Sequence, residues 1–308
     1  MKPYYTLTDL LSDADIINQG HELPAKLAVI GDPIAHSKSP LMQQAALNAA
    51  KINARYIRIQ ASPDEFDHVI KTLQTKGFIG ANVTIPHKQR AYKLCTNADS
   101  LAKATEAVNT LVFENDGSIS GFNTDGPGFA YAIRDEFSMD LRDLKIVLLG
   151  ACGGAGLALA YTCAMNGCER LTLAGRSAEK LNSLKSSLSH YFRDENRLSG
   201  SSDRLAAYEN NTPRFNEAVA DAELIINATS LGLKSTDGSP LPIHLLEPYH
   251  LIYDLQTHST TLQQEAYQKG ARAVNGISML VYQGALAFER WFGIKPDVRA
   301  MQQALKNV

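Results

Sequence analysis

The chain has 308 residues, a formal net charge of −2 and 44% hydrophobic residues. This length allows two domains with separate cores, and the composition is typical of a soluble globular protein. The near-neutral charge argues against a broad nucleic-acid-binding surface, and no apolar run is long enough to span a membrane. The four cysteines lack Cys-x-x-Cys pairs and metal-ligand spacing. We therefore expect free thiols, a cytoplasmic protein and no bound metal.

The first part of the chain contains two closely spaced serines. Residues 1–25 have scattered acids and no long apolar core, so we expect an N-terminal extension with one short helix rather than a signal peptide. A strand at 26–30 leads into a loop in which Ser37 and Ser39 alternate, and Pro40 opens an amphipathic helix. An extended loop would present both hydroxyls on one side, although Ser39 alone could simply be the helix N-cap.

Two candidate catalytic residues follow the next strands. A strand at 55–59 and a helix at 63–76 continue the α/β alternation, and the strand at 79–83 leads to Lys88 near the start of a helix. Ligands of open α/β sheets bind beyond the carboxyl ends of strands, so Lys88 is a candidate, with a solvated surface lysine as the alternative. An Asn-Asp-Gly hairpin signal then precedes Asp125, which is either a site residue or a helix cap.

A glycine cluster after a buried strand predicts a nucleotide site. The apolar residues 146–149 are followed by four glycines within seven positions and then by an Ala-rich helix. This order exposes backbone N–H groups at a helix N-terminus, where a pyrophosphate can bind. The usual fingerprint is G-x-G-x-x-G, but Gly150, Gly153 and Gly156 are three apart. Either the turn holds one extra residue, or Cys152 is tolerated in place of the second glycine.

The end of the next strand indicates which cofactor is bound. The strand 171–174 is followed by Arg176, Ser177 and Lys180, with no acidic residue at its tip. An acid there would bind a ribose 2′-hydroxyl, whereas these residues suit a 2′-phosphate. The sequence therefore predicts NADP rather than NAD.

The rest of the chain continues the alternation and then turns helical. Gln283 is polar within an apolar helix, and is either a ligand contact or a core amide satisfied by backbone. The expected elements are a helix at 178–192, a polar stretch at 193–213 with a surface loop at 199–203, strands at 224–226 and 251–255, and helices at 260–269, 275–291 and 297–305.

Together these stretches resemble the shikimate dehydrogenase family from Leu27 to Asn307. The matching motifs, in the family's order, are His36-Ser-Lys-Ser-Pro40, Asn82-Val-Thr-Ile-Pro-His-Lys88, Ala107-Val-Asn-Thr-Leu111, Gly121-Phe-Asn-Thr-Asp125, the glycine loop, Gly175-Arg-Ser177, Asn227-Ala-Thr-Ser-Leu-Gly232 and Gly276-Ile-Ser-Met-Leu-Val-Tyr-Gln283. Each motif alone is weak evidence. Their number and order are specific, and they outweigh the capping and surface alternatives given above.

The resemblance implies an α/β fold with two domains. An α/β substrate domain would consist of residues 1–124 and the returning C-terminal helices at 276–308, and a Rossmann-like NADP-binding domain would span 125–275. The implied reaction is the reversible, NADPH-dependent reduction of 3-dehydroshikimate to shikimate, a step in aromatic amino-acid biosynthesis. The implied partners are small molecules, without nucleic acid or membrane, and the protein would be a monomer or a homodimer.

The resemblance also assigns roles to individual residues. Lys88 and Asp125 would be the catalytic pair, and a lysine ammonium can stabilise or protonate the alkoxide that forms from a carbonyl without a metal. The substrate would bind to Ser37 and Ser39 through its carboxylate, and to Thr84, Asn109 and Gln283 through its hydroxyls. The cofactor would bind to Gly150, Gly153, Gly154, Ala155, Gly156, Arg176, Ser177, Lys180, Thr229, Leu255, Gly276 and Met279.

One departure from the family keeps the substrate preference open. The family usually has a tyrosine shortly after the strand-end Asp254, and Thr257 stands at that place here. A quinate/shikimate dehydrogenase paralogue is therefore an alternative. A catalytically silent NADP(H)-binding regulator on the same fold is another, because fold does not determine function. The presence of both Lys88 and Asp125 argues against the regulator.

Overall fold

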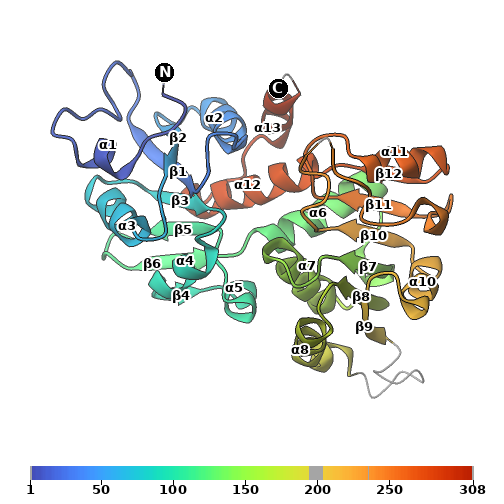
Figure 1. The fold of residues 1–308 in the computed structure, drawn as a ribbon. Coiled ribbons are helices and arrows are strands. Elements are labelled where there is room, and N and C mark those ends of the chain that lie inside the picture. Colours follow the sequence, from blue (N-terminus) through green and yellow to red (C-terminus); the bar gives the residue numbers. More distant parts are fainter. Residues whose placement is uncertain (1, 194–203, 235, 307–308) are drawn as a thin grey trace. The chain divides into compact units, whose positions relative to one another are not determined.

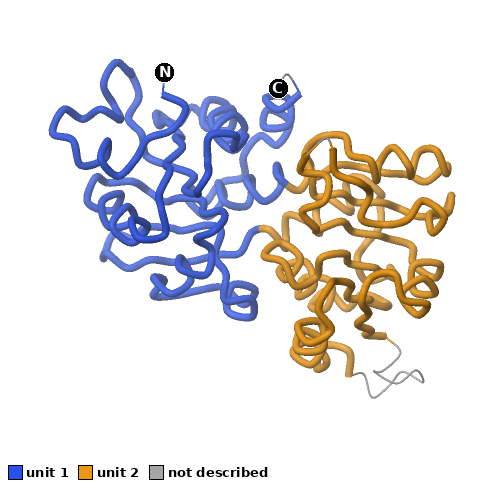
Figure 2. Tube along the Cα trace, in the orientation of Figure 1, with its two compact units in different colours: residues 1–124, 280–308 blue, residues 125–279 orange. Residues whose placement is uncertain are grey.

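The computed structural model describes residues 2–193, 204–234 and 236–306, so the expected surface loop at 199–203 lies outside the described residues. The chain forms two compact units (Figures 1 and 2): unit 1 is Met1–Thr124 with Leu280–Val308, and unit 2 is Asp125–Met279. Each unit contains a six-stranded sheet with helices packed on it, which confirms the expected α/β fold. Among the described residues, no helix combines the length and apolarity needed to cross a membrane.

The sheet of unit 1 is mixed, in the order β2-β1-β3-β5-β6-β4. Its strands are β1 (Ala25–Gly31), β2 (Arg55–Gln60), β3 (Gly80–Val83), β4 (Asn97–Ala98), β5 (Thr110–Phe113) and β6 (Ile119–Phe122). The first three are parallel, and β5 and β6 form the expected antiparallel hairpin. The backbone of Gly117 in the hairpin turn has φ +84°, a conformation that glycine adopts without steric cost.

The N-terminal residues belong to the core of unit 1 rather than forming a separate extension. Tyr5, Leu10 and Ile17 are buried in one cluster with Val69 and Leu73. The helices of this unit are α1 (Leu7–Leu11), α2 (Ser39–Ala49), α3 (Phe66–Thr75), α4 (Lys88–Leu94), α5 (Ser100–Thr105), α13 (Val298–Leu305) and the greater part of α12 (Ile277–Phe292). This packing was not expected, because scattered apolar residues in a polar segment show no clear period.

Unit 2 is a doubly wound domain with an all-parallel sheet in the order β12-β11-β10-β7-β8-β9. Its strands are β7 (Lys145–Leu149), β8 (Arg170–Gly175), β9 (Leu205–Glu209), β10 (Leu224–Asn227), β11 (Leu251–Asp254) and β12 (Arg272–Val274). Its helices are α6 (Asp125–Phe137), α7 (Gly154–Met165), α8 (Ala178–Leu188), α10 (Pro213–Ala220) and α11 (Thr261–Gln268), with 3₁₀ turns η1 (Leu141–Asp143), η2 (Ser189–Phe192) and η3 (Ile243–Leu245). Helices α6, α7 and α8 lie on one side of the sheet, and α10 and α11 on the other (Figure 1).

Two boundaries differ from the expectation. Strand β9 lies in the polar stretch at 193–213, for which no strand was expected. Within the described residues it is an edge strand that pairs with β8, and its partly exposed side chains give no apolar run. Unit 1 resumes at Leu280 rather than at residue 276, inside α12. The reason is that the first turn of α12 is bonded to β11 in unit 2: the Met279 N–H donates to the Tyr253 hydroxyl at 3.0 Å.

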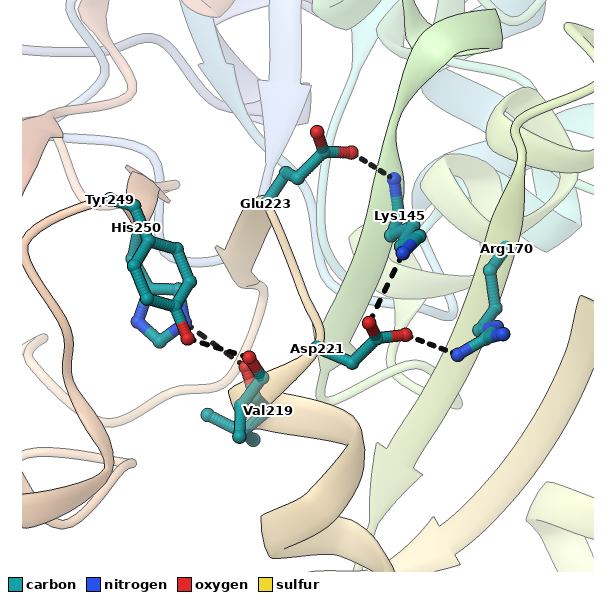
Figure 3. A network of polar contacts seen from close by, with 8 residues as sticks. Lys145, Arg170, Val219, Asp221, Glu223, Tyr249 and His250 are labelled. Carbon is teal, nitrogen blue, oxygen red and sulfur yellow. Dashed lines mark hydrogen bonds and ion pairs between the residues drawn. The ribbon is translucent and has the colours of Figure 1, made fainter.

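Polar contacts hold the amino ends of the strands in unit 2 (Figure 3). The Lys145 ammonium and the Arg170 guanidinium both bind the Asp221 carboxylate, and the Lys145 backbone N–H donates to Glu223 at 3.0 Å. These groups are partly exposed, so each ion pair contributes little stability. They lie at the edge of the sheet opposite to the glycine turn, which follows the carboxyl end of β7.

A buried histidine near this network is held in its neutral form. His250 is fully buried, and its Nε2 lies 3.0 Å from the Val219 carbonyl oxygen (Figure 3). Its Nδ1 accepts a hydrogen bond from the Glu247 N–H at 3.0 Å. Because Nδ1 accepts, the proton resides on Nε2 and is donated to Val219. Burial lowers the pKa of His250 below its ordinary value.

We expect His250 to make the stability of unit 2 depend on pH. Between the lowered folded-state pKa and about 6.5, the unfolded chain binds a proton that the folded chain does not, so the free energy of unfolding falls as pH falls. His250→Gln keeps an amide donor but cannot titrate, and should flatten this slope in urea titrations at several pH values. His244→Gln, at an exposed position, is the control and should keep the wild-type slope. An unchanged slope in His250→Gln would contradict the prediction.

Candidate functional site

The serine loop, residues 32–38 and Ser39, follows the carboxyl end of β1. The Ser37 N–H donates to the Ile34 carbonyl at 3.0 Å, and the Ser37 hydroxyl oxygen accepts from the Ser39 N–H at 3.3 Å. Ser39 is the first residue of α2, and the N-cap position belongs to Lys38, so Ser39 is not the cap. Neither serine hydroxyl donates a hydrogen bond to any residue that the structure describes. The loop therefore offers two hydroxyl donors to an anion.

Lys88 is placed by the segment that follows β3. It is half-buried as the first residue of α4, and its carbonyl accepts from the Val108 N–H at 3.0 Å. The preceding His87 is buried, stacks on Phe66 with ring centroids 4.5 Å apart, and places Nε2 2.8 Å from the Ala61 carbonyl oxygen. The backbone on both sides of Lys88 is thus fixed. The sequence provided no reason to single out His87, because its partners are distant in the chain.

Thr84 lies between β3 and Lys88. Its N–H donates to the Ile30 carbonyl at 2.9 Å, which holds it beside the end of β1. Its hydroxyl makes no hydrogen bond within the described ranges. A Cβ on Gly31 would lie 2.5 Å from the Thr84 side chain, so only glycine fits at the end of β1 next to Thr84.

Asn109, Thr124 and Gln283 are joined by hydrogen bonds although they are far apart in the sequence. Asn109 Nδ2 donates to the Thr124 hydroxyl at 3.0 Å and to Gln283 Oε1 at 3.4 Å, and the Thr124 N–H donates to Asn109 Oδ1 at 2.8 Å. Asp125, buried as the first residue of α6, directly follows Thr124 and begins unit 2. Unit 1 therefore brings Asn109 and Gln283 together. Thr124, which is bonded to Asn109, is followed in the chain by Asp125.

A second layer of buried polar groups supports Asn109. Asn82 Nδ2 donates to the Asn109 carbonyl at 3.1 Å and to the Thr110 hydroxyl at 3.0 Å, and the Tyr56 hydroxyl donates to Asn82 Oδ1 at 2.7 Å. Burial raises the pKa of Tyr56 well above its ordinary value, so Tyr56 stays a donor. Every polar atom of the Asn82 side chain is used in this way. Polar residues in a buried strand were the only sequence signal for this layer.

The glycine turn in unit 2 contains the extra residue. Gly150 follows β7 with φ +76°, the Gly153 N–H donates to the Gly150 carbonyl at 2.9 Å, and Gly153 is the N-cap of α7. Ala151 and the exposed Cys152 occupy the middle of the turn. A Cβ on Gly156 would lie 2.2 Å from the Gly150 carbonyl oxygen, so glycine is required where helix and turn meet. Gly154 and Ala155 form the first turn of α7, whose N–H groups have no helical partners.

Cations follow the neighbouring strand β8. Arg176 and Lys180 are exposed, and neither forms an ion pair within the described part of the chain. Ser177 is the N-cap of α8, and its hydroxyl accepts from the Lys180 N–H at 3.4 Å. Two cations and an available hydroxyl donor at a helix N-terminus form a suitable site for a phosphate group.

The remaining candidate cofactor residues follow β10, β11 and β12 at the same edge. Thr229 donates its N–H and hydroxyl to Asn227 Oδ1 at 3.0 and 2.7 Å. A Cβ on Gly276 would lie 2.3 Å from the Leu255 carbonyl oxygen. The Met279 N–H is already bonded to Tyr253, so this residue has no free backbone donor.

Asp254 at the end of β11 organises these loops and was not among the candidates. It accepts hydrogen bonds from Asn227 Nδ2 at 3.0 Å, from the Gln256 N–H at 3.1 Å and from the Thr260 hydroxyl at 2.6 Å. Burial raises the pKa of its carboxyl group. The half-buried Thr257 lies in the short loop that these bonds hold. An acidic residue at the end of an apolar strand is a signal that could have identified Asp254.

The chain is similar to known proteins along most of its length. Residues 29–111 match the family model of the shikimate dehydrogenase substrate binding domain, and residues 276–306 that of the shikimate 5′-dehydrogenase C-terminal domain. The NADP(+)-dependent shikimate dehydrogenases of Methanopyrus kandleri and Geobacillus kaustophilus are 35% and 36% identical, covering 91% and 89% of this chain and 94% and 95% of theirs. The crystal structure of Thermus thermophilus shikimate 5-dehydrogenase with NADP(H) and shikimate has a TM-score of 0.79 at 30% identity, over 92% of this chain and 99% of that chain.

Proposed function

Because this chain belongs to the shikimate dehydrogenase family, we propose that it catalyses the reversible, NADP-dependent interconversion of 3-dehydroshikimate and shikimate. One observation supports this proposal above the others. Unit 1 presents two serine hydroxyl donors in one loop, together with Lys88 and the bonded pair of Asn109 and Gln283, beyond or beside the carboxyl ends of its central strands. A polyhydroxylated carboxylic acid needs both kinds of group, donors for its carboxylate and hydrogen-bonding side chains for its hydroxyls.

The residues of unit 1 suggest how the substrate is held. Ser37 and Ser39 donate to the carboxylate, and Thr84, Asn109 and Gln283 bind the ring hydroxyls. Lys88 places its ammonium at the oxygen of the reacting carbonyl, where it stabilises the developing negative charge and provides a proton. Asp125 accepts a hydrogen bond from the same oxygen in the alcohol state, and in the reverse direction the neutral Lys88 amine takes the proton back.

The residues of unit 2 fit an NADP molecule. Gly150 and Gly156 allow the close approach of turn and helix, and the free N–H groups at the start of α7 suit a pyrophosphate. Arg176 and Lys180 would hold the 2′-phosphate, because both are exposed and unpaired by any described acid. When bound, the cofactor supplies or accepts the hydride.

We expect shikimate to be preferred over quinate. Quinate carries an additional hydroxyl on the carbon that bears the carboxylate, and this hydroxyl would crowd Ser37 and Ser39 and cost the carboxylate one of their hydrogen bonds. The kcat/KM for shikimate should be higher by about tenfold or more, which corresponds to the loss of one hydrogen bond to a charged group. Initial rates of NADP⁺ reduction with each acid measure this ratio. A higher kcat/KM for quinate would identify the paralogue, and NADP binding without any turnover would identify the regulator.

The cellular location and the oligomeric state of the enzyme are also part of the proposal. All four cysteines are free thiols, which is usual in the reducing cytoplasm. The enzyme would act there on small molecules as a monomer or a homodimer, and light scattering after gel filtration distinguishes the two states.

A further inference from the structure

The N-terminal segment, residues 2–9, forms an isolated β-bridge with the edge strand β2 of the sheet in unit 1. Tyr5 pairs in parallel with Ile59 of β2. The Tyr5 N–H donates to the Arg58 carbonyl at 2.9 Å, and the Gln60 N–H donates to the Tyr5 carbonyl at 2.8 Å. The Tyr5 side chain is 7% exposed within the core cluster. This segment is therefore built into the sheet directly beside Arg58.

The Arg58 side chain connects this segment to the serine loop. Its Nε and Nη2 atoms both donate to the Ser37 carbonyl, at 2.9 and 2.7 Å, and its Nη1 donates to the Pro3 carbonyl at 3.4 Å. Two bonds from one planar guanidinium fix both the position and the direction of the Ser37 peptide group. The carbonyl of the residue that offers a hydroxyl to the substrate is thus held from behind by a cation.

Other contacts hold the N-terminal segment in place. Lys2 Nζ binds Asp9 Oδ1 at 2.7 Å, and the Asp9 carboxylate also accepts from the Thr6 N–H at 3.0 Å in a capping box at the start of α1. Leu10 in the same helix is completely buried. Pro3, between these contacts and Tyr5, therefore has a defined position from which its carbonyl can accept from Arg58.

We propose that Arg58, supported by residues 2–9, is a positioning residue for the serine loop and thereby sets the affinity for the substrate carboxylate. The inference rests on the proposed function, in which Ser37 and Ser39 bind that carboxylate. Without Arg58, the Ser37 peptide loses two hydrogen bonds, and the loop must be ordered when the substrate binds, which lowers affinity. The reacting end of the substrate is held by other residues, so turnover of the bound substrate is unaffected.

The test compares Arg58→Met with Arg55→Met, which is a matched control. Arg55 lies on the same strand and likewise donates to backbone carbonyls that precede β1, those of Leu23 and Ile17, but it forms no hydrogen bond with the serine loop among the described residues. Arg58→Met should raise KM for shikimate about tenfold, the effect of losing one or two hydrogen bonds to a charged group, with kcat within about twofold. Arg55→Met should leave KM unchanged. Equal increases in both variants, or no increase in Arg58→Met, would overturn the proposal.

A substrate without the negative charge provides a second readout. The methyl ester of shikimate lacks the carboxylate, so its kcat/KM should fall less in Arg58→Met than that of shikimate. Equal losses for the two compounds would overturn the assignment to carboxylate affinity. The wild-type enzyme is measured first: if it oxidises neither shikimate nor quinate, the proposed function fails, and shikimate binding measured by calorimetry still tests Arg58. A tenfold weaker binding in Arg58→Met than in Arg55→Met supports the role, and equal binding overturns it.

Discussion

Lys88→Met is expected to lower kcat by about 10²–10⁴-fold, the range for loss of an acid–base group. The variant removes the positive charge that faces the developing alkoxide while keeping a side chain of similar length. KM for shikimate and for NADP⁺ should change little, because other residues bind both compounds. Lys88 is half-buried at the start of a short helix, so the fold should persist. Steady-state kinetics with circular dichroism of the same samples measure both effects.

The control for this variant lies on the same helix. Lys93 is exposed in the last turn of α4, and Lys93→Met should keep the wild-type kcat. If Lys88→Met folds and retains a kcat close to that of the Lys93→Met enzyme, Lys88 is not part of the mechanism.

Asp125 extends the same prediction to a pair. Asp125→Asn keeps the shape of the side chain but removes its charge, and should also reduce kcat strongly with a smaller effect on cofactor affinity. Because the two residues would act on one oxygen, the double variant with Lys88→Met should lose far less activity than the product of the single losses. Losses that multiply fully would show that the two residues act independently.

Removing the cations after β8 is expected to abolish the preference for NADP. Each charge-assisted contact to a phosphate contributes about 1.5–3 kcal/mol, so Arg176→Met should lower kcat/KM for NADP⁺ about tenfold or more, and Arg176→Met with Lys180→Met about a hundredfold or more. The kcat/KM for NAD⁺ should not fall, because NAD lacks the 2′-phosphate. The ratio of the two values measures the selectivity.

Lys185 provides the control for cofactor selectivity. It lies in the last turn of α8, away from the helix N-terminus that follows β8. Lys185→Met should leave the ratio of NADP⁺ to NAD⁺ unchanged. Equal use of both cofactors by the wild-type enzyme would contradict the assignment of Arg176 and Lys180, whatever the variants do.

The sequence by itself determined the features that depend on local chemistry. A buried strand, a glycine turn and an apolar helix predicted the doubly wound unit around Gly150, since a positive φ and close helix packing require glycine at set positions. The strand-to-helix order also located Lys88 and Asp125, the first residues of their helices, and Arg176, which lies between β8 and the N-cap of α8. Ligand-facing residues in open α/β sheets gather at one edge, so strand order alone indicates where they lie.

The tertiary structure alone decided the contacts between distant segments. Examples are the hydrogen bond between Asn109 and Gln283, the hydrogen bond from Asn227 to Asp254 and the two hydrogen bonds from Arg58 to the Ser37 carbonyl. Each joins parts of the chain that no sequence period relates. The edge strand β9 lacked the apolar pattern of central strands, because among the described residues only one of its sides is covered by another strand and its side chains are partly exposed. The N-terminal residues had no pattern of their own, since they are ordered by the sheet edge against which they pack.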